Sequence, residues 1–242
     1  MSIAEKLQTI AENEQRVYDA GKQAEYDEFW DAYQDYGNRG EYAYAFGGIG
    51  WTKTDMFPPK YPIKLNDLIV GNIGIFRDFN KRATTRYDMT TICATMDCSK
   101  AVRLNGMFAD ACVENITIDM SNCQIAIEMF SCANGGGNID KIYLKVTEKL
   151  TNATGMFSYC NNLETISFAE NSVIAVNLDF THSPLSEGSI RNVINTLSST
   201  ATSKTLTLKK TAVQNAFGSD YDSSTEWTTL KNSKSNWTIS LK

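Results

Sequence analysis

Histidine is nearly absent from this 242-residue sequence, which contains only His182. Nucleophilic triads rely on a histidine base and many zinc sites use several histidines, so both kinds of site are disfavoured. His182 stands beside Ser183 and Pro184, which predicts a position in an exposed loop. The sequence also has no Cys-x-x-Cys pair, no Gly-x-Gly-x-x-Gly and no Lys-Ser/Thr after its glycine run. We therefore expect no enzyme, no metal site and no cofactor.

Long apolar runs and basic clusters are missing as well. No run reaches the roughly 18 apolar residues that suggest a membrane span, and the first residues lack the basic-then-apolar order of a secretory signal. Residues 1–40 hold nine acidic and four basic residues, which leaves nineteen of each sign from totals of 28 and 23. The net charge of −5 thus lies in the N-terminal arm. Without a basic stripe, we expect no nucleic-acid partner and no membrane insertion.

Residues 3–36 predict a helix, because they contain no proline and are rich in Ala, Glu, Gln and Lys. The apolar residues Ile3, Leu7, Ile10 and Val17 follow heptad spacing, which favours a short coiled coil that joins copies of the chain. The alternative is a single amphipathic helix that packs on its own domain. Acidic pairs in this arm are typical of a solvated helix face rather than of glycosidase carboxylates.

Aromatic residues are dense between positions 26 and 51, and Asn38 and Gly40 predict the end of the helix. Three of the four prolines follow, between residues 58 and 62, in an irregular connector. Such aromatic density usually marks a packing interface, with a carbohydrate platform as the alternative. The candidates for an assembly interface are Phe29, Trp30, Tyr33, Tyr36 and Trp51.

A repeat is the most informative feature of the sequence. Three segments share a Met-Phe pair, at residues 107–108, 129–130 and 156–157, so the pairs are 22 and 27 residues apart. Each pair is followed by a cysteine and then by residues that alternate between apolar and polar. We interpret each unit as a helical or turn segment followed by a strand, and we expect neighbouring units to stack into a parallel sheet.

The alternation assigns an inward and an outward face to the strands. Ile116, Ile118 and Met120 point one way, and the residues Ile142, Leu144 and Val146 repeat that pattern. The concave face of a solenoid is its usual binding surface, so we expect the solvent face of this sheet to bind a partner. The candidate ligand-binding residues are therefore Thr117, Asp119, Tyr143, Lys145, Thr165 and Ser167.

Degenerate repeat units are expected before and after the three clear ones. An earlier strand would contain Ala94, Met96 and Cys98, and a later unit would include residues 173–180. Beyond them, Ser186 predicts the cap of a helix that reaches Ser198. Strands are expected around 206–208 and 237–241 and helices around 214–217 and 225–230, as a cap for the open end of the core.

Six cysteines are present: Cys93, Cys98, Cys112, Cys123, Cys132 and Cys160. An even number would permit disulfides. However, Cys112, Cys132 and Cys160 follow their Met-Phe methionines by 5, 3 and 4 residues, so they share one repeat position. A thiol that recurs in this way is typical of a small buried side chain, which favours free cysteines in the core.

The segment Gly-Met-Phe-Ser-Tyr-Cys-Asn-Asn-Leu-Glu-Thr-Ile-Ser-Phe at 155–168 resembles the BspA-like leucine-rich repeat. The resemblance covers about residues 90–180. The first two units depart from it, through Val113-Glu114 and through the glycine run at 135–137. It implies an α/β fold: an N-terminal helical anchor, then an irregular leucine-rich-repeat solenoid with a parallel sheet and a C-terminal α/β cap. The segments would be 1–36 (anchor), 37–62 (connector), 63–182 (repeats) and 183–242 (cap).

The N-terminal stretches 10–21 and 24–32, with Lys-Tyr-Pro at 60–62, resemble tail-region proteins of tailed phages and prophages of Firmicutes. This resemblance implies a virion protein made in the host cytoplasm without a signal peptide: part of a tail tip, baseplate, tail fibre or head fibre. Its partners would be other virion proteins, further copies of the chain (a homotrimer, by analogy with phage fibres) and a host-surface glycan or protein for adhesion. The alternative is a bacterial leucine-rich-repeat module that binds a protein outside any virion.

Overall fold

The computed structural model describes residues 12–13, 15–16, 19–28, 30–31, 63–64, 74–81, 83–134 and 137–242. In these residues the protein is mixed α/β, its sheets are small, and every strand pair is parallel. The expected α/β class with parallel sheets is therefore confirmed. The strands are β1 (Ile63–Lys64), β2 (Tyr87–Asp88), β3 (Met96–Asp97), β4 (Cys112–Glu114), β5 (Ile116–Asp119), β6 (Asn138–Ile139), β7 (Lys141–Lys145), β8 (Thr165–Phe168), β9 (Leu178–Phe180), β10 (Lys204–Leu208) and β11 (Trp237–Leu241). The helices are α2 (Thr90–Thr95), α3 (Glu187–Thr196), α4 (Lys210–Phe217), the 3-10 turn η3 (Tyr221–Ser223) and α5 (Thr225–Asn232).

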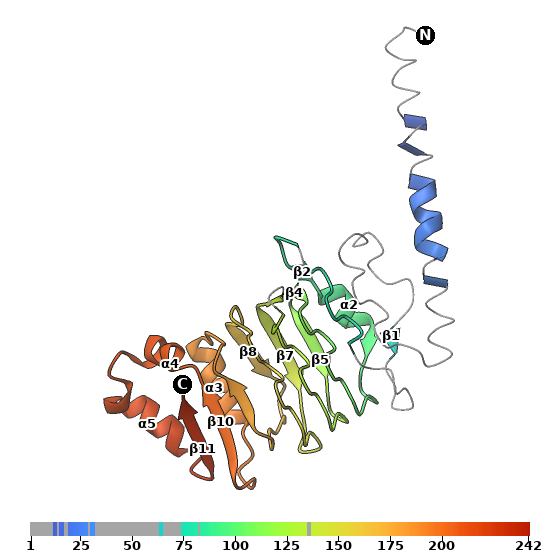
Figure 1. Cartoon of the computed structure of the whole chain (residues 1–242). Helices are drawn as coiled ribbons and strands as arrows, with labels where there is room; N and C mark the ends of the chain where they lie inside the picture. Colours follow the sequence, from blue (N-terminus) through green and yellow to red (C-terminus); the bar gives the residue numbers. More distant parts are fainter. Residues whose placement is uncertain are drawn as a thin grey trace.

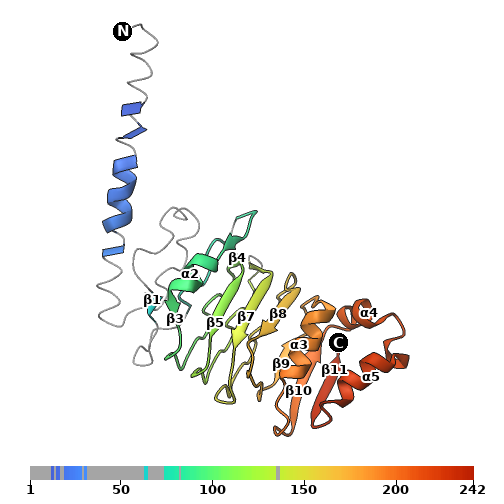
Figure 2. The same cartoon turned by 180° about the vertical axis from the view of Figure 1, so that it is seen from behind.

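Successive segments lie side by side along one direction, from α2 and β3 at one end to β11 and α5 at the other (Figure 1). Strands β5, β7 and β8 form one sheet, and β9, β10 and β11 form another nearer the C-terminus. The view from behind shows α3, α4 and α5 grouped around the second of these sheets (Figure 2). Sequence order thus runs along the length of the strand-rich part.

The Met-Phe segments are turns rather than helices. Each begins with a residue of positive φ: Gly106 (59°), Glu128 (54°) and Gly155 (66°). Backbone bonds join each turn to the next, since Phe108 N–H donates to Met129 O at 2.8 Å and Phe130 N–H donates to Met156 O at 2.9 Å. The predicted repeat therefore corresponds to turns that stack in register.

The phenylalanines of these turns form one continuous stack with Phe76 before them and Phe180 of β9 after them. Their rings lie nearly parallel, with centroid separations of 5.2, 5.7, 5.6 and 4.5 Å between successive members. The stack is formed by Phe76, Phe108, Phe130, Phe157 and Phe180, all buried. The last ring lies in the expected later unit, whereas the first was not anticipated, because Ile75 stands where the other turns have methionine.

The strands alternate as predicted. Ile116, Ile142 and Ile166 are paired across β5, β7 and β8 and are buried, while the residues between them face outward. The earlier strand predicted around Ala94 is wrong in part: Ala94 belongs to α2, and β3 pairs with β1 instead of β5. Helix α2 covers the edge of β5, where the N–H of Thr117 reaches the Sγ of Cys93 at 3.4 Å.

Helix α3 covers the opposite edge of the same sheet, next to β8. Ser186 caps it as predicted, and the helix ends at Thr196. The buried Ser189 Oγ accepts a hydrogen bond from the N–H of Ile166 at 3.0 Å and donates to Glu164 O at 2.9 Å. Side chains from two helices thus replace the strands that would otherwise pair with the sheet edges.

Replacing Ser189 with alanine is expected to lower the free energy of unfolding by about 1–2 kcal/mol, because it leaves the N–H of Ile166 buried without an acceptor. Equilibrium unfolding in urea measures the change. The control is Ser199→Ala, an exposed serine just after the helix, which should change stability by less than about 0.5 kcal/mol. Equal effects of the two substitutions would contradict the proposed edge cover.

The C-terminal elements agree with the prediction. Strand β10 contains Leu206 and Leu208, strand β11 contains Trp237 and Ile239, and all four side chains are buried. Helices α4 and α5 each extend beyond the residues expected to be helical. The indole Nε1 of Trp237 donates to Ser198 O at 2.9 Å, which ties the last strand to the end of α3.

Near the N-terminus, the described residues between 12 and 31 are helical, in agreement with the predicted helix. Trp30 is 0% exposed, and its ring centroid lies 6.4 Å from that of Tyr26. The side chain of Trp30 therefore packs within its own chain. The other residues predicted for self-association and assembly lie outside the described residues: Ile3, Leu7, Ile10, Val17, Phe29, Tyr33, Tyr36 and Trp51. Among the described helices, none has the length and apolar character needed to span a bilayer.

Candidate functional site

The outward face of β5, β7 and β8 brings the predicted ligand-binding residues together. Thr117, Tyr143 and Ser167 form one row across the three strands. Lys141 and Thr165 form a second pair on β7 and β8, two residues before Tyr143 and Ser167. This row follows from the alternation of the strands, because their apolar neighbours fill the core. Tyr143 is 42% exposed, which makes it one of two large exposed hydrophobic side chains among the described residues.

Asp119 and Lys145 form the next row of this face. Their side chains make an ion pair, with 2.9 Å between the Lys145 Nζ and an Asp119 oxygen. Partial burial raises the pKa of Asp119, but hydrogen bonds from Ser121 and Lys145 outweigh it, so the pKa lies below its ordinary value. The carboxylate of Asp119 is therefore charged at neutral pH, and the ion pair lies on the surface rather than in the core.

A shallow groove of about 220 Å³ runs over this face. Four of the six predicted residues line it, while the Asp119–Lys145 pair does not. Its lining is Thr90, Asn115, Ile116, Thr117, Lys141, Ile142, Tyr143, Thr165 and Ser167. The groove offers hydroxyl groups, an amide, a lysine and one exposed ring, which are groups suited to polar contact with a partner.

Sequence reasoning missed three of the polar residues of the groove. Lys141 could have been predicted, because it lies two residues before Tyr143 and on the same outward face of the strand as Tyr143 and Lys145. Thr90 and Asn115 carry no such signal: Thr90 begins α2, and Asn115 lies between two strands with a φ of 57°. Thr90 reaches the groove because α2 packs beside β5, and Asn115 lines it from the position just before β5.

The six cysteines are buried and free, as the repeat position of three of them predicted. Burial raises the pKa of Cys93 to about 11 and that of Cys123 to about 12. The pKa of Cys160 is raised by its neighbour Cys132 and by burial. In the described part of the chain, no group of three or more His, Cys, Asp or Glu side chains is placed to hold a metal ion.

The raised pKa values keep the thiols of Cys93, Cys123 and Cys160 protonated and unreactive, because the thiolate is the nucleophile. Burial also shields all six cysteines from reagents in solution. We expect none of the six to react with Ellman's reagent at pH 8 in the folded protein, and all six to react in guanidinium. The thiolate forms only as the pH rises toward the elevated pKa values. The exposed variant Thr117→Cys should react at once and is the positive control. Rapid reaction of any native cysteine would contradict the assignment.

His182 lies in a turn after β9, and its ring is partly exposed, as the expected loop position implies. The ring stacks on Tyr159 with a centroid separation of 4.5 Å. Tyr159 itself is half exposed and has a φ of 59°. This pair continues outward from the Phe157–Phe180 contact and was not anticipated from the sequence.

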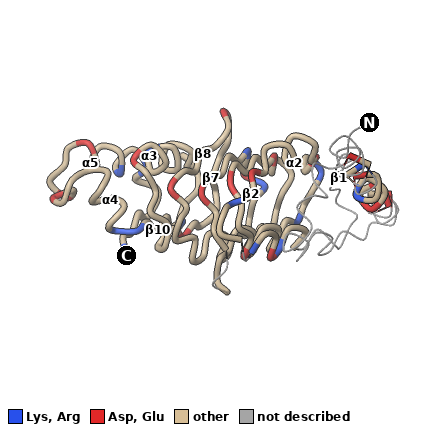
Figure 3. Tube along the Cα trace, turned by 90° about the horizontal axis from the view of Figure 1, so that it is seen from above, with Lys and Arg blue, Asp and Glu red and all other residues tan. Residues whose placement is uncertain are grey.

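Charged residues of both signs are spread along the described part of the chain (Figure 3). No like-charged stripe accompanies the groove, whose only charged lining residue is Lys141. The fold and the site together define a mixed α/β protein with small parallel sheets and a polar outward face. Comparison with protein-family models, with curated proteins and with solved structures found no match.

Proposed function

We propose that the protein is a non-enzymatic structural component of a phage particle that presents a leucine-rich-repeat domain for assembly or for adhesion to the host surface. The resemblance of residues 155–168 to BspA-like repeats supports the repeat assignment. The resemblance of residues 10–32 to phage tail-region proteins supports the location. The helical arm would join copies of the chain, with three copies as the expected number.

The observation that carries the binding part of the proposal is the row of Thr117, Tyr143 and Ser167 on adjacent strands. Parallel pairing of the three strands holds these residues in register, so they offer one continuous polar surface. Tyrosine supplies contact area at low entropic cost, and the hydroxyl groups adapt to varied hydrogen-bond partners. We therefore assign adhesion or assembly contacts to this face.

Binding of the full chain to host cells tests this assignment. Tyr143→Ala should weaken binding at least about tenfold, which corresponds to about 1.4 kcal/mol. The control is Tyr221→Phe, a change at a buried tyrosine of η3 that does not line the groove. If Tyr143→Ala and Lys141→Ala both bind as the natural sequence does, this face is not the contact surface.

Membership of a particle is tested separately. The chain should be found by mass spectrometry in purified phage particles, and the full-length protein should be oligomeric in solution by light scattering. A strictly monomeric protein that never appears in purified particles would reject the proposal. That result would favour the alternative, a bacterial leucine-rich-repeat module that binds a protein partner.

A further inference from the structure

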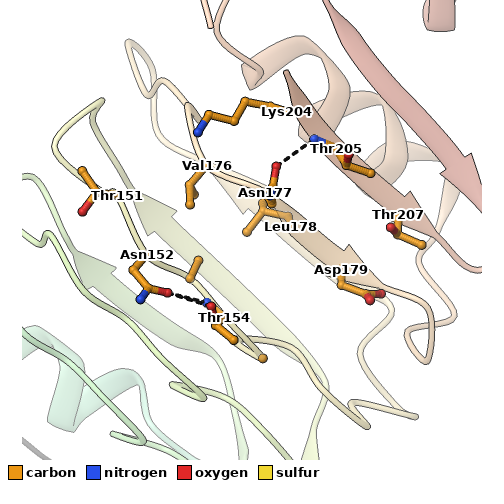
Figure 4. A pocket seen from close by; sticks show the side chains of 12 residues that line it. Thr151, Asn152, Thr154, Val176, Asn177, Leu178, Asp179, Lys204, Thr205 and Thr207 are labelled. Atoms are coloured by element: carbon orange, nitrogen blue, oxygen red, sulfur yellow. Dashed lines mark hydrogen bonds between the residues drawn. The ribbon is translucent and has the colours of Figure 1, made fainter. Parts of the chain in front are cut away.

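A larger groove, of about 490 Å³, lies between the residues 151–155 and the strands β9 and β10 (Figure 4). It shares no residue with the groove over β5, β7 and β8. Its walls are mostly polar, and Ala153, Val176 and Leu178 contribute buried apolar surface. A volume of this size falls within the roughly 300–1,000 Å³ of small-molecule sites.

The groove forms where a row of backbone hydrogen bonds stops. In the preceding turn, Ala126 N–H donates to Asn152 O at 2.8 Å and Glu128 N–H donates to Thr154 O at 2.9 Å. The residues one repeat later are Ala153 and Gly155. Within the described part of the chain, neither of their N–H groups has an acceptor.

These N–H groups are the equivalent donors of the next unit, and β9 lies across the groove from them. Strand β9 is at the edge of its sheet: β10 pairs with one side, and among the described strands none pairs with the other. Ala153 is only 5% exposed, so its N–H needs a partner in the groove. The groove therefore contains backbone donors that the chain itself does not satisfy.

Two asparagines add further donors, and their orientation is fixed. Asn152 Oδ1 accepts from Thr154 N–H at 3.0 Å, and Asn177 Oδ1 accepts from Thr205 N–H at 2.8 Å. Since a backbone N–H can only donate, each amide must turn its oxygen toward it. Each Nδ2 then has no acceptor among the described residues and remains available to the groove.

The groove holds one charged group of each sign. Lys204 lies at the start of β10, and Asp179 lies on β9. One oxygen of Asp179 accepts from the N–H of Thr181 at 2.8 Å and from its hydroxyl, so the carboxylate is held in place as well. The lining thus combines several donors with one fixed acceptor and has no net charge.

The shape of the groove argues against an inserted peptide strand. A strand placed between two others needs about 9–10 Å between its neighbours, twice the usual strand spacing. At one end, however, the rings of Phe157 and Phe180 stack at 4.5 Å, so the adjacent segments lie next to each other there. An extended chain has no passage through that end, which favours a short ligand.

We infer that this groove is a binding site for a neutral saccharide. The hydroxyl and ring oxygens of a sugar accept from the N–H groups of Ala153 and Gly155 and from the two asparagine amides. One hydroxyl donates to Asp179, and the C–H face of the ring covers Val176 and Leu178. The groups are held before binding, so little ordering is needed when the ligand arrives. The assignment does not depend on membership of a phage particle.

Amide spectra of the full ¹⁵N-labelled chain test the site directly. The probes are the methyl glycosides of glucose, galactose, mannose and N-acetylglucosamine, each at about 10 mM, a concentration that detects a Kd in the millimolar range. With at least one of them, the amide signals of Ala153 and Gly155 should shift, while those of Thr117 and Tyr143 stay in place. No shift of these two signals with any probe overturns the inference.

Asn177→Asp tests the assigned amide donor, because the aspartate keeps an oxygen for Thr205 N–H and loses the Nδ2 donors. It should weaken binding at least about tenfold, whereas the matched change Asn161→Asp, on an exposed turn outside the groove, should not. A second variant, Thr154→Trp, fills the groove from its exposed rim and should abolish the shifts. Unchanged binding in both groove variants overturns the site. Neither result alters the particle and cell-binding tests, which address the proposed function separately.

Discussion

Replacement of Phe130 by alanine should lower the free energy of unfolding by about 3–5 kcal/mol, the range measured for large buried aromatic residues. Phe130 is fully buried and stacks on both sides, 5.7 Å from Phe108 and 5.6 Å from Phe157. The substitution removes two ring contacts and leaves a cavity between neighbouring turns. Because those turns also exchange backbone bonds, they are held in place and cannot collapse into the space.

Equilibrium unfolding in urea or guanidinium measures this effect. The matched control is Tyr143→Ala, which removes an aromatic ring from the exposed face and should change stability by less than about 0.5 kcal/mol. Phe130→Leu should retain about half of the lost stability, because it fills part of the cavity. A loss below about 1 kcal/mol for Phe130→Ala would mean that the stack is not the centre of the core.

The features that the sequence predicted are those that carry a recognisable pattern of residues. Three Met-Phe pairs identified the stacked turns, and alternation identified the outward row of Thr117 and Tyr143. The helix capped by Ser186 was also predictable, because a capping residue and an apolar stripe occur together there. Each of these signals lies within one short stretch of chain, where local geometry decides the outcome.

The features that escaped prediction depend on contacts between distant segments. Ile75-Phe76 joins the stack although its sequence lacks the methionine, because shape and burial matter more than the identity of the first residue. Helix α2 replaces an expected strand where it can cover the edge of β5. The saccharide groove depends on an interruption: β9 lies across the groove from residues 151–155 but accepts no backbone hydrogen bond from Ala153 or Gly155. No pattern in residues 151–155 predicts that the N–H groups of Ala153 and Gly155 have no acceptor among the described residues.

The role of Gly137 also depends on contacts between distant segments, and its substitution gives the second of the two largest effects that we predict. It ends the glycine run at 135–137, through which the second unit departs from the repeat pattern. A Cβ at this position would lie 2.6 Å from the Sγ of Cys132 and 3.0 Å from the Cα of Asp110. Close approach of the backbone, rather than an unusual φ, therefore requires glycine here.

Gly137→Ala should accordingly lower the free energy of unfolding by about 2–3 kcal/mol, since the added methyl group displaces both a buried thiol and a neighbouring backbone. Asp110 accepts hydrogen bonds from the N–H and side chain of Asn134, so a shift of its backbone also disturbs that turn. Thermal or urea unfolding of the full chain measures the loss.

The control is the same change at Gly188, which lies in α3 with no atom near the position of an added Cβ. Gly188→Ala should raise stability by about 0.5–1 kcal/mol, because alanine loses less backbone entropy in a helix. The two substitutions add the same atom, so their opposite signs separate packing from backbone entropy. Adding Cys132→Ala to Gly137→Ala should restore part of the loss by removing the Sγ atom, while its Cβ, 2.9 Å from the added methyl, limits the recovery. Equal effects at Gly137 and Gly188 would mean that the turn opens freely. The interpretation that the first and second repeat units pack closely at Gly137 would then be wrong.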